Sequence, residues 1–168
     1  MLEERLQALK KDLIEYATHV EHMLDTCIRA LLKKDKSALE AVIGVDEPRA
    51  NNYEIALDDE CIKVIAQSEP KAKALRLILM IAKMNKDLER MADHVVNIAE
   101  SSLFLVERPP VKPLLDLPVM ADIARRMLRD SISSFINEDT TIINDVCGRD
   151  HSVDSLRDQI LRELITFM

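Results

Sequence analysis

Four oxygen-bearing side chains recur along one stretch of this sequence at a spacing that suits metal binding. Glu89, Asp93 and Asn97 stand at every fourth position, and Glu100 follows three residues later. On an α-helix, residues at this spacing share one face, and these four fall within an arc of about 80°. Carboxylate and amide oxygens suit magnesium, manganese or iron, whereas structural zinc sites favour sulfur and nitrogen. We call these four residues the acidic stripe and expect it to hold a divalent or trivalent metal ion.

A second group of acids and amides lies on the helix predicted before the stripe. Like charges one helical turn apart cost roughly a few tenths of a kcal/mol per pair, and a bound cation would offset that repulsion. Antiparallel helices can bring two such groups to one site, as carboxylate-bridged bundles do. The second group is Asp46, Glu47, Asn51 and Glu54. The candidate metal ligands are therefore Glu89, Asp93, Asn97, Asp46 and Glu100.

Two other functions remain open for these acids. They can be solvated on the surface of a helical interaction module, with Lys83, Lys86 and Arg90 close enough to pair with them. They can also belong to a carboxylate-bridged metalloenzyme, although the Glu-x-x-His pattern of di-iron oxidases is absent. Because the sequence also has no Gly-rich phosphate loop and no nucleophile elbow, we expect a protein that is not an enzyme.

The histidines offer weaker metal sites than the acidic stripe. His94 lies about 100° around the helix from the preceding Asp93, so we expect it at a surface or an interface. His19 and His22 form a possible but nonspecific ligand pair, and His151 is expected to be solvated.

Composition restricts the class of protein. The 168 residues include only two glycines and 3% aromatic residues, which argues against a sheet and for an all-α fold. A net charge of −7 argues against nucleic-acid binding. No signal sequence and no apolar run of about 18 residues is visible, so we expect no membrane insertion and a cytoplasmic location. The three cysteines lack CxxC spacing and are expected in the core; they are Cys27, Cys61 and Cys147.

The apolar periodicity predicts a series of long helices. The first spans residues 2–33, and a second, which Asp35 caps, runs to about residue 67 with an interruption near Gly44 and Pro48. Ser68-Glu69-Pro70 is expected to start a third helix to residue 106. Two more follow at 119–137 and 139–168. The expected apolar face of the third helix is Leu77, Ile81, Met84, Leu88, Ala92, Val95 and Ala99, and Met80, Met84 and Met91 are expected to be core residues.

The two glycines mark an internal repeat. Gly44 and Gly148 are 104 residues apart, and the same shift pairs Asp35 with Asp139. A period of roughly 100 residues predicts two units of three helices in tandem: a first repeat at 1–107, a Pro-rich linker at 108–118, and the first two helices of a second repeat at 119–168. The second repeat lacks a third helix with its own acidic motif, which leaves an apolar groove. Large exposed apolar patches are rare on monomers, so we expect a partner helix, a swapped segment or a second copy of the chain to cover it, and we expect a homodimer.

Several segments resemble the PhoU family of phosphate-uptake regulators. The run Asp87–Glu100 is similar to that family's signature, an acidic residue followed after three others by Asp, which Glu89 and Asp93 match. The Gly-x-Asp turn at Asp46, the segment 59–62, the Pro-rich linker and the segment 154–164 are also similar, so the resemblance covers essentially the whole chain.

The resemblance implies a fold of two three-helix bundles with metal clusters on the acidic stripes. It also implies a negative regulator that couples the ATPase of a Pst-type phosphate ABC transporter to a sensor histidine kinase. The second acidic motif of the family would fall beyond residue 168, so the resemblance implies at most half of a second metal site, from Asp150 and Asp154.

Overall fold

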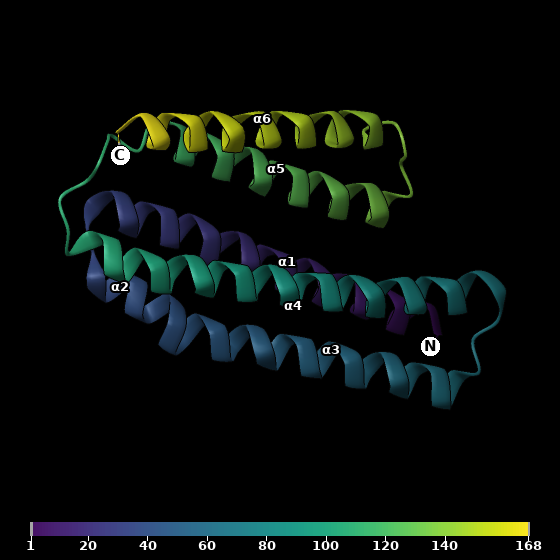
Figure 1. The fold of residues 1–168 in the computed structure, drawn as a ribbon. Helices are drawn as coiled ribbons and strands as arrows, with labels where there is room; N and C mark the ends of the chain where they lie inside the picture. The colour runs from purple at the N-terminus through teal and green to yellow at the C-terminus, as the bar shows by residue number, and fades with distance from the viewer. Residues whose placement is uncertain (1, 168) are drawn as a thin grey trace.

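The computed structural model describes residues 2–167, all of whose regular elements are helices. They are α1 (Leu2–Lys33), α2 (Lys36–Ala41), the π-helical turn η1 (Val42–Asp46), α3 (Glu47–Ser68), α4 (Ala72–Val106), α5 (Asp116–Asn137) and α6 (Ile143–Phe167). Figure 1 shows α1 and α4 running in one direction and α3 running against them, while α5 and α6 form a hairpin on the other side of α1 and α4. The predicted all-α class is confirmed.

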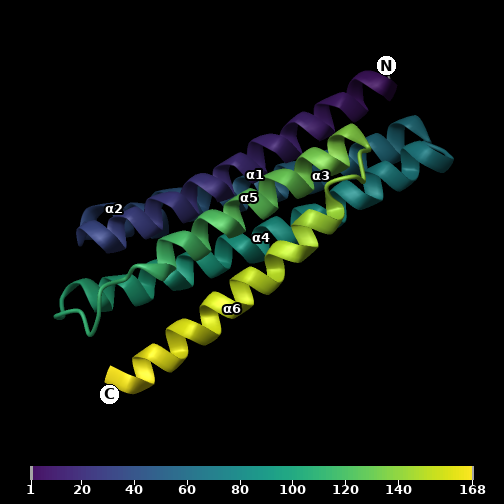
Figure 2. The ribbon, with the colours of Figure 1, turned by 90° about the horizontal axis from the view of Figure 1, so that it is seen from above.

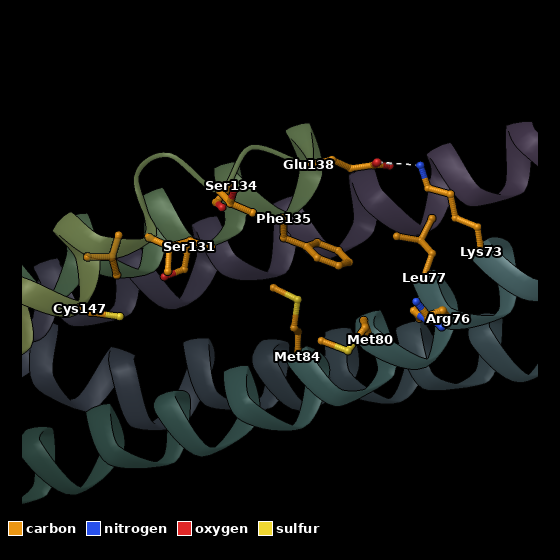
Figure 3. A pocket seen from close by; sticks show the side chains of 13 residues that line it. Lys73, Arg76, Leu77, Met80, Met84, Ser131, Ser134, Phe135, Glu138 and Cys147 are labelled. Carbon is orange, nitrogen blue, oxygen red and sulfur yellow. Dashed lines mark hydrogen bonds and ion pairs between the residues drawn. The ribbon is translucent and has the colours of Figure 1, made fainter.

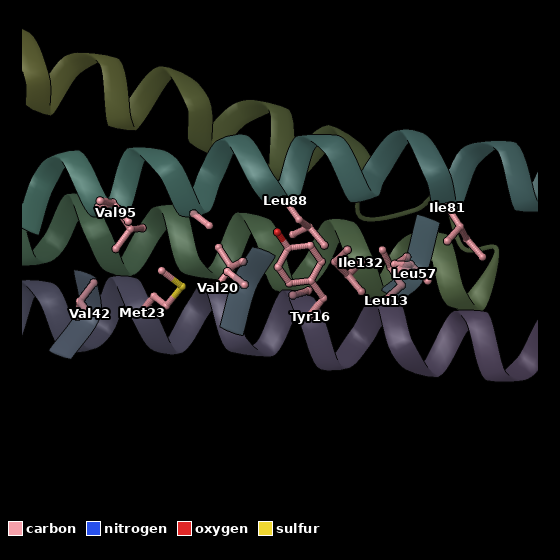
Figure 4. Close-up of a cluster of buried hydrophobic side chains, with 14 of the residues drawn as sticks. Leu13, Tyr16, Val20, Met23, Val42, Leu57, Ile81, Leu88, Val95 and Ile132 are labelled. Atoms are coloured by element: carbon pink, nitrogen blue, oxygen red, sulfur yellow. The ribbon is translucent and has the colours of Figure 1, made fainter. Parts of the chain in front are cut away.

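The core of the first bundle follows a repeat of seven residues. Buried positions in α1 alternate steps of three and four, as a helix seam requires; they are Leu6, Leu9, Leu13, Tyr16, Val20, Met23, Cys27 and Ala30. The same steps in α4 give Ile78, Ile81, Asn85, Leu88, Ala92, Val95, Ala99 and Ser102. Side chains of both series meet between the helices in Figure 4. One continuous core therefore fixes the order of α1, α3 and α4.

The predicted apolar face of α4 is correct at five positions and wrong at two. Leu77 and Met84 are only half-buried, whereas Ile78 and Asn85 are completely buried. Asn85 is tolerated in the core because its Nδ2 donates to the Glu54 carbonyl oxygen at 2.8 Å. α4 carries apolar residues on two adjacent faces, so its sequence alone did not show which face meets α1 and α3.

The helix ends follow the turn chemistry, with some corrections. Asp35 caps α2 as predicted, since its side chain accepts the Ala38 N–H at 3.1 Å. The expected interruption near Gly44 is the π-helical turn of η1. Ser68-Glu69-Pro70 does not start a helix: α3 runs to Ser68, Glu69 is left-handed with φ of 43°, and α4 begins at Ala72. The last two helices begin at Asp116 and Ile143, not at 119 and 139.

The ends of α1 and α5 share the turn that the repeat predicts. α1 ends at Lys33 and α5 ends at Asn137, and the following residues, Lys34 and Glu138, are both left-handed with φ of 55° and 53°. The next residue is Asp35 in one case and Asp139 in the other, and each carboxylate accepts a backbone N–H. The repeat thus has a structural basis, while the unit boundaries at 1–107, 108–118 and 119–168 remain a prediction.

α6 is the least supported helix of the described chain. Of the helices it packs on α5 alone, and α5 in turn packs on α1; Figure 2 shows α6 diverging from the bundle toward the C-terminus. None of its described residues is fully buried. Cys147 on this helix is exposed, so its predicted core position is wrong, whereas Cys27 and Cys61 are buried as expected.

No helix within residues 2–167 combines the length and apolar character that crossing a membrane requires.

Candidate functional site

The acidic stripe lies on the second half of α4, and its carboxylates have no Lys or Arg partner within residues 2–167. Glu89 is half-buried, and Asp93, Asn97 and Glu100 are exposed. Within residues 2–167, none of the three acids forms an ion pair: Lys86 pairs with Glu54 instead, and the neighbouring Arg90 pairs with Asp87. The repulsion expected from the sequence is therefore not relieved by a salt bridge.

The register of α3 against α4 brings part of the second acidic group to the stripe. The bond from Asn85 to Glu54 sets these residues level across two antiparallel helices. Since both helices rise equally per residue, Glu89 lies level with Ala50 and Asp93 lies level with Asp46. The register therefore puts Asp46, the last residue of η1, at about the level of Asp93. The two remaining stripe residues, Asn97 and Glu100, continue past this level alongside η1 and α2.

The carboxylates are not gathered around one point. In the part of the chain that the structure describes, no three His, Cys, Asp or Glu side chains converge closely enough to hold an ion. The acids instead stand on successive turns of facing helices. Metal binding at this place thus requires side-chain rotation, which exposed carboxylates on a helix surface can make without moving the backbone.

A buried hydroxyl that sequence reasoning missed lies beside these acids. Tyr16 of α1 is completely buried, and its hydroxyl has no hydrogen-bond partner among the described residues. Burial raises the pKa of this phenol, and the nearby carboxylates of Glu54, Glu89 and Asp93 raise it further. The only signal in the sequence was a polar aromatic residue within the apolar series of α1.

The oxygen donors of these acids are of the type that a hard cation prefers. Glu54, Glu89, Asp93 and Asp46 supply oxygen atoms from two helices, as magnesium, manganese and iron prefer. The unpartnered hydroxyl of Tyr16 shows that polar groups on the core side of these acids are not yet satisfied. The residue types suit the expected metal, but within residues 2–167 their positions do not form a site for one ion.

The two histidines of the possible ligand pair, His19 and His22, make separate contacts. His19 is buried, and its Nε2–H donates to the Asp46 carbonyl oxygen at 2.9 Å, a carbonyl that belongs to the π-helical turn. His22 is exposed and lies near the Thr26 hydroxyl. His94 and His151 are exposed. The contact from His19 fixes the backbone at Asp46, which positions one candidate ligand.

A second feature is an apolar groove between α4, α5 and α6. It has two connected parts of about 610 Å³ and 430 Å³, which share Met84, Ser131 and Val146. In Figure 3, Met80 and Met84 of α4 face Phe135 of α5, and the ion pair of Lys73 with Glu138 lies at the rim. The predicted core methionines therefore line the groove: Met80 is 41% exposed, and Met84 and Met91 are half-buried.

Comparison with known proteins agrees with this architecture. The family model described as "PhoU domain" matches residues 13–102 and 117–168. The chain is 37% identical over 165 residues to a "Phosphate-specific transport system accessory protein PhoU homolog" of Aquifex aeolicus, which covers 98% of this chain and 74% of that protein. A homolog of the same name from Deinococcus radiodurans is 33% identical, over 99% of this chain and 78% of that protein.

A solved structure shares the fold. The phosphate transport system regulatory protein PhoU from Streptococcus pneumoniae superimposes with a TM-score of 0.91 at 24% identity, over 100% of this chain and 79% of that chain. With a family model that matches most of the sequence and relatives above 30% identity over nearly its whole length, this chain belongs to the PhoU family.

Proposed function

We propose that this protein regulates phosphate uptake and phosphate-starvation signalling as a metal-binding adaptor without catalytic activity. Its relatives are named as accessory proteins of phosphate-specific transport systems, which supports the transport role. As an adaptor it negatively couples the ATPase of a Pst-type phosphate transporter to a sensor histidine kinase in the cytoplasm. The long, charged outer faces of the first bundle offer the surface for such partners.

The observation that carries the metal proposal is the unpaired acidic stripe beside the buried, unpartnered Tyr16 hydroxyl. Glu89 and Asp93 hold the ion, and Asp46 approaches from the facing helix at the level of Asp93. Asn97 and Glu100 extend the ligand set along α4. The bound ion contributes positive charge that holds α3 and α4 together; iron, manganese and magnesium suit these oxygen ligands better than zinc.

Replacing both Glu89 and Asp93 by alanine is expected to abolish the bound metal. Protein is purified without chelator and its metal content measured by mass spectrometry, with manganese(II) titration as a second readout. The matched control is Glu21→Ala/Asp25→Ala on α1, which also removes two acids four residues apart, but acids that pair with Arg129 and Arg125 of α5. Equal metal content in Glu89→Ala/Asp93→Ala and the wild type would reject the proposed site.

The alternative of a solvated interaction module is favoured by one contact, the ion pair of Lys86 with Glu54. The two functions differ in their response to chelator. A metal at a free concentration of a hundred times its Kd stabilises the folded state by about 2.7 kcal/mol, so chelation lowers the melting temperature of an adaptor that binds metal. An unchanged melting temperature supports the solvated module.

We further propose that a second copy of the chain covers the groove between α4, α5 and α6. Arg76 borders one end of the groove and Asp150 borders the other, and neither has an ion-pair partner within residues 2–167. A twofold axis across the groove exchanges its ends. Each Arg76 then meets Asp150 of the partner subunit, and the dimer contains this contact twice. The methionine side chains between these ends adapt readily to a facing helix.

Light scattering at micromolar concentration is expected to give twice the chain mass of 19.1 kDa. The substitution Met80→Asp places a charge in the groove and should yield monomers. Leu79→Asp, at the adjacent and more exposed position outside the lining, should leave the dimer intact. Arg76→Asp should weaken the dimer, and adding Asp150→Arg should restore it. A wild-type monomer, or no rescue by the double reversal, would refute this arrangement.

A further inference from the structure

Two ion pairs, one helical turn apart, join the α5–α6 hairpin to α1. Arg129 of α5 donates from Nη2 to a carboxylate oxygen of Glu21 at 2.5 Å. Arg125, one turn earlier on α5, pairs with Asp25, one turn later on α1. Both pairs therefore follow one antiparallel register, in which α5 lies along α1 (Figure 2). Of the helices of the first bundle, α5 packs on α1 alone.

The apolar contact beneath these ion pairs is narrow. Among the described residues of α5, only Ile132 and Ser134 are fully buried, and Ile132 alone joins the buried apolar core of the first bundle. A cavity of about 380 Å³, lined in part by Ile132, lies between α1 and α5, and another of about 210 Å³ lies between α1, α4 and α5. Side chains that line a void lose packing contacts, so α5 is held less tightly than α3 or α4.

The linker divides into a part fixed on the first bundle and a part fixed on the hairpin. Glu107 pairs with Lys36 of α2, whereas Lys112 pairs with Glu163 of α6. Residues 108–111, which lie between these two anchors and include two prolines, are all exposed. Exposed segments of this composition are typical of boundaries between moving units. Rotation within residues 108–111 can therefore move the hairpin as one unit and keep the contacts at both anchors.

The ion pairs that cross from the hairpin to the first bundle are open to solvent. The Arg129 side chain is 61% exposed. A third pair joins Glu138, just after α5, to Lys73 of α4 at 2.7 Å, and both of its side chains are more than half exposed. Ion pairs in contact with solvent are weak and are screened by salt. Docked and released positions of the hairpin are therefore close in free energy, while the core of α1, α3 and α4 holds the first bundle together.

We propose that the α5–α6 hairpin is a releasable arm that its ion pairs with Glu21 and Asp25 hold on α1, and that its release opens this face of α1 and α4 to an amphipathic helix of a partner protein. The docked arm is then an autoinhibitory contact, since the face is free only when the hairpin has moved away. This inference goes beyond the proposed adaptor function by naming the chemistry of a partner, and it depends on neither the metal nor the dimer.

The sequence of α5 shows which chemistry the partner helix needs. Two arginines, Arg125 and Arg129, stand one turn apart and match the two acids of α1. Leu128, Ile132 and Ile136 stand at every fourth position and pack against the core of the first bundle. A helix with two cationic side chains beside such an apolar ridge can replace α5 by the same contacts.

The test follows the hairpin by single-molecule fluorescence energy transfer at picomolar concentration, which is too dilute for the proposed dimer. The dyes are attached at Asn52→Cys on α3 and Ser152→Cys on α6, two exposed positions, in a chain that carries Cys147→Ser. Cys27 and Cys61 are buried and take no dye. Raising the salt concentration from about 0.1 M to about 1 M should increase the fraction of molecules with a long distance between the dyes, because salt screens the ion pairs.

Reversing one charge should release the arm, and reversing its partner should restore docking. Arg129→Glu should raise the ratio of released to docked molecules about 5-fold, because repulsion from Glu21 replaces attraction. Adding Glu21→Arg should return the ratio to that of the wild type. The matched control is Arg126→Glu: Arg126 is 60% exposed, as Arg129 nearly is, but it pairs with Asp122 within α5. Equal ratios in Arg129→Glu and Arg126→Glu, or no restoration by Glu21→Arg, would overturn the role of the ion pairs.

A peptide with the sequence of residues 116–137 serves as the probe for the partner helix. Added unlabelled to the labelled chain, it should convert docked molecules to released ones, and Arg129→Glu should need less peptide than the wild type, because its face is free more often. The same peptide with both Arg125 and Arg129 replaced by glutamate should convert fewer molecules. A released fraction that does not change over the titration would overturn the docking of a partner helix on this face.

Discussion

Replacing Ile81 by alanine is expected to lower the free energy of unfolding by about 3 kcal/mol. Ile81 is completely buried in the core of the first bundle, and its position in the seven-residue series of α4 faces both α1 and α3. Truncation removes apolar contacts and leaves a cavity, because long helices joined along their whole length cannot collapse locally. Urea denaturation followed by circular dichroism measures the change.

The control for this substitution is two residues away on the same helix. Leu79 is 55% exposed, so Leu79→Ala should change the free energy of unfolding by less than about 0.5 kcal/mol. Both variants remove similar helix-forming side chains from α4, so their difference isolates burial. Equal losses in the two variants would contradict the assigned orientation of α4.

The amide hydrogens of α6 are expected to exchange with solvent about 100-fold faster, or more, than those in the middle of α1. Among the helices α6 contacts α5 alone, its Glu163 pairs with Lys112 of the linker, and none of its described residues is buried, so it can open without disturbing the core of the first bundle. Local opening of this kind costs less free energy than global unfolding. Hydrogen exchange with mass spectrometry, at a protein concentration low enough to keep the chain monomeric, gives the comparison.

The same measurement tests the proposed dimer independently of its mass. Raising the protein concentration should slow exchange in α6 and around Met80, while the middle of α1 is unaffected. Uniform protection of α1 and α6 in dilute protein would show that α6 is stabilised by contacts other than those with α5. Met80→Asp serves as the reference, since its exchange in α6 should not depend on concentration.

Much of the local structure was predictable because it depends on residues close in sequence. The helix class follows from composition, and the long helices follow from apolar steps of three and four. The caps at Asp35 and the turn at Asp139 follow from the preference of short acidic side chains for backbone N–H groups. The acidic stripe is likewise a property of one helix, so the spacing of Glu89 and Asp93 defines it without tertiary contacts.

The candidate site was only partly predictable because it combines three helices. The sequence identified the acids on α4 and the group that begins at Asp46, but their mutual level depends on the bond between Asn85 and Glu54. Tyr16 and Asn85 were missed because a polar residue on the apolar face of a helix is not by itself a sign of a functional site. Their orphaned atoms become evident only when α1, α3 and α4 pack together.

The sequence by itself determined the helices, their ends to within a few residues, the repeat and the spacing of the acidic stripe, all of which arise from short-range periodicity and turn chemistry. That these acids form no ion pair within residues 2–167 was decided by the structure. Tertiary structure decided which of two apolar faces of α4 enters the core, and this left Met80 and Met84 in the groove. It also left Cys147 of α6 exposed. It also decided that a buried phenol lies behind the acids. The physical reason is that burial depends on the neighbour a face meets, and this neighbour is set by the packing of whole helices.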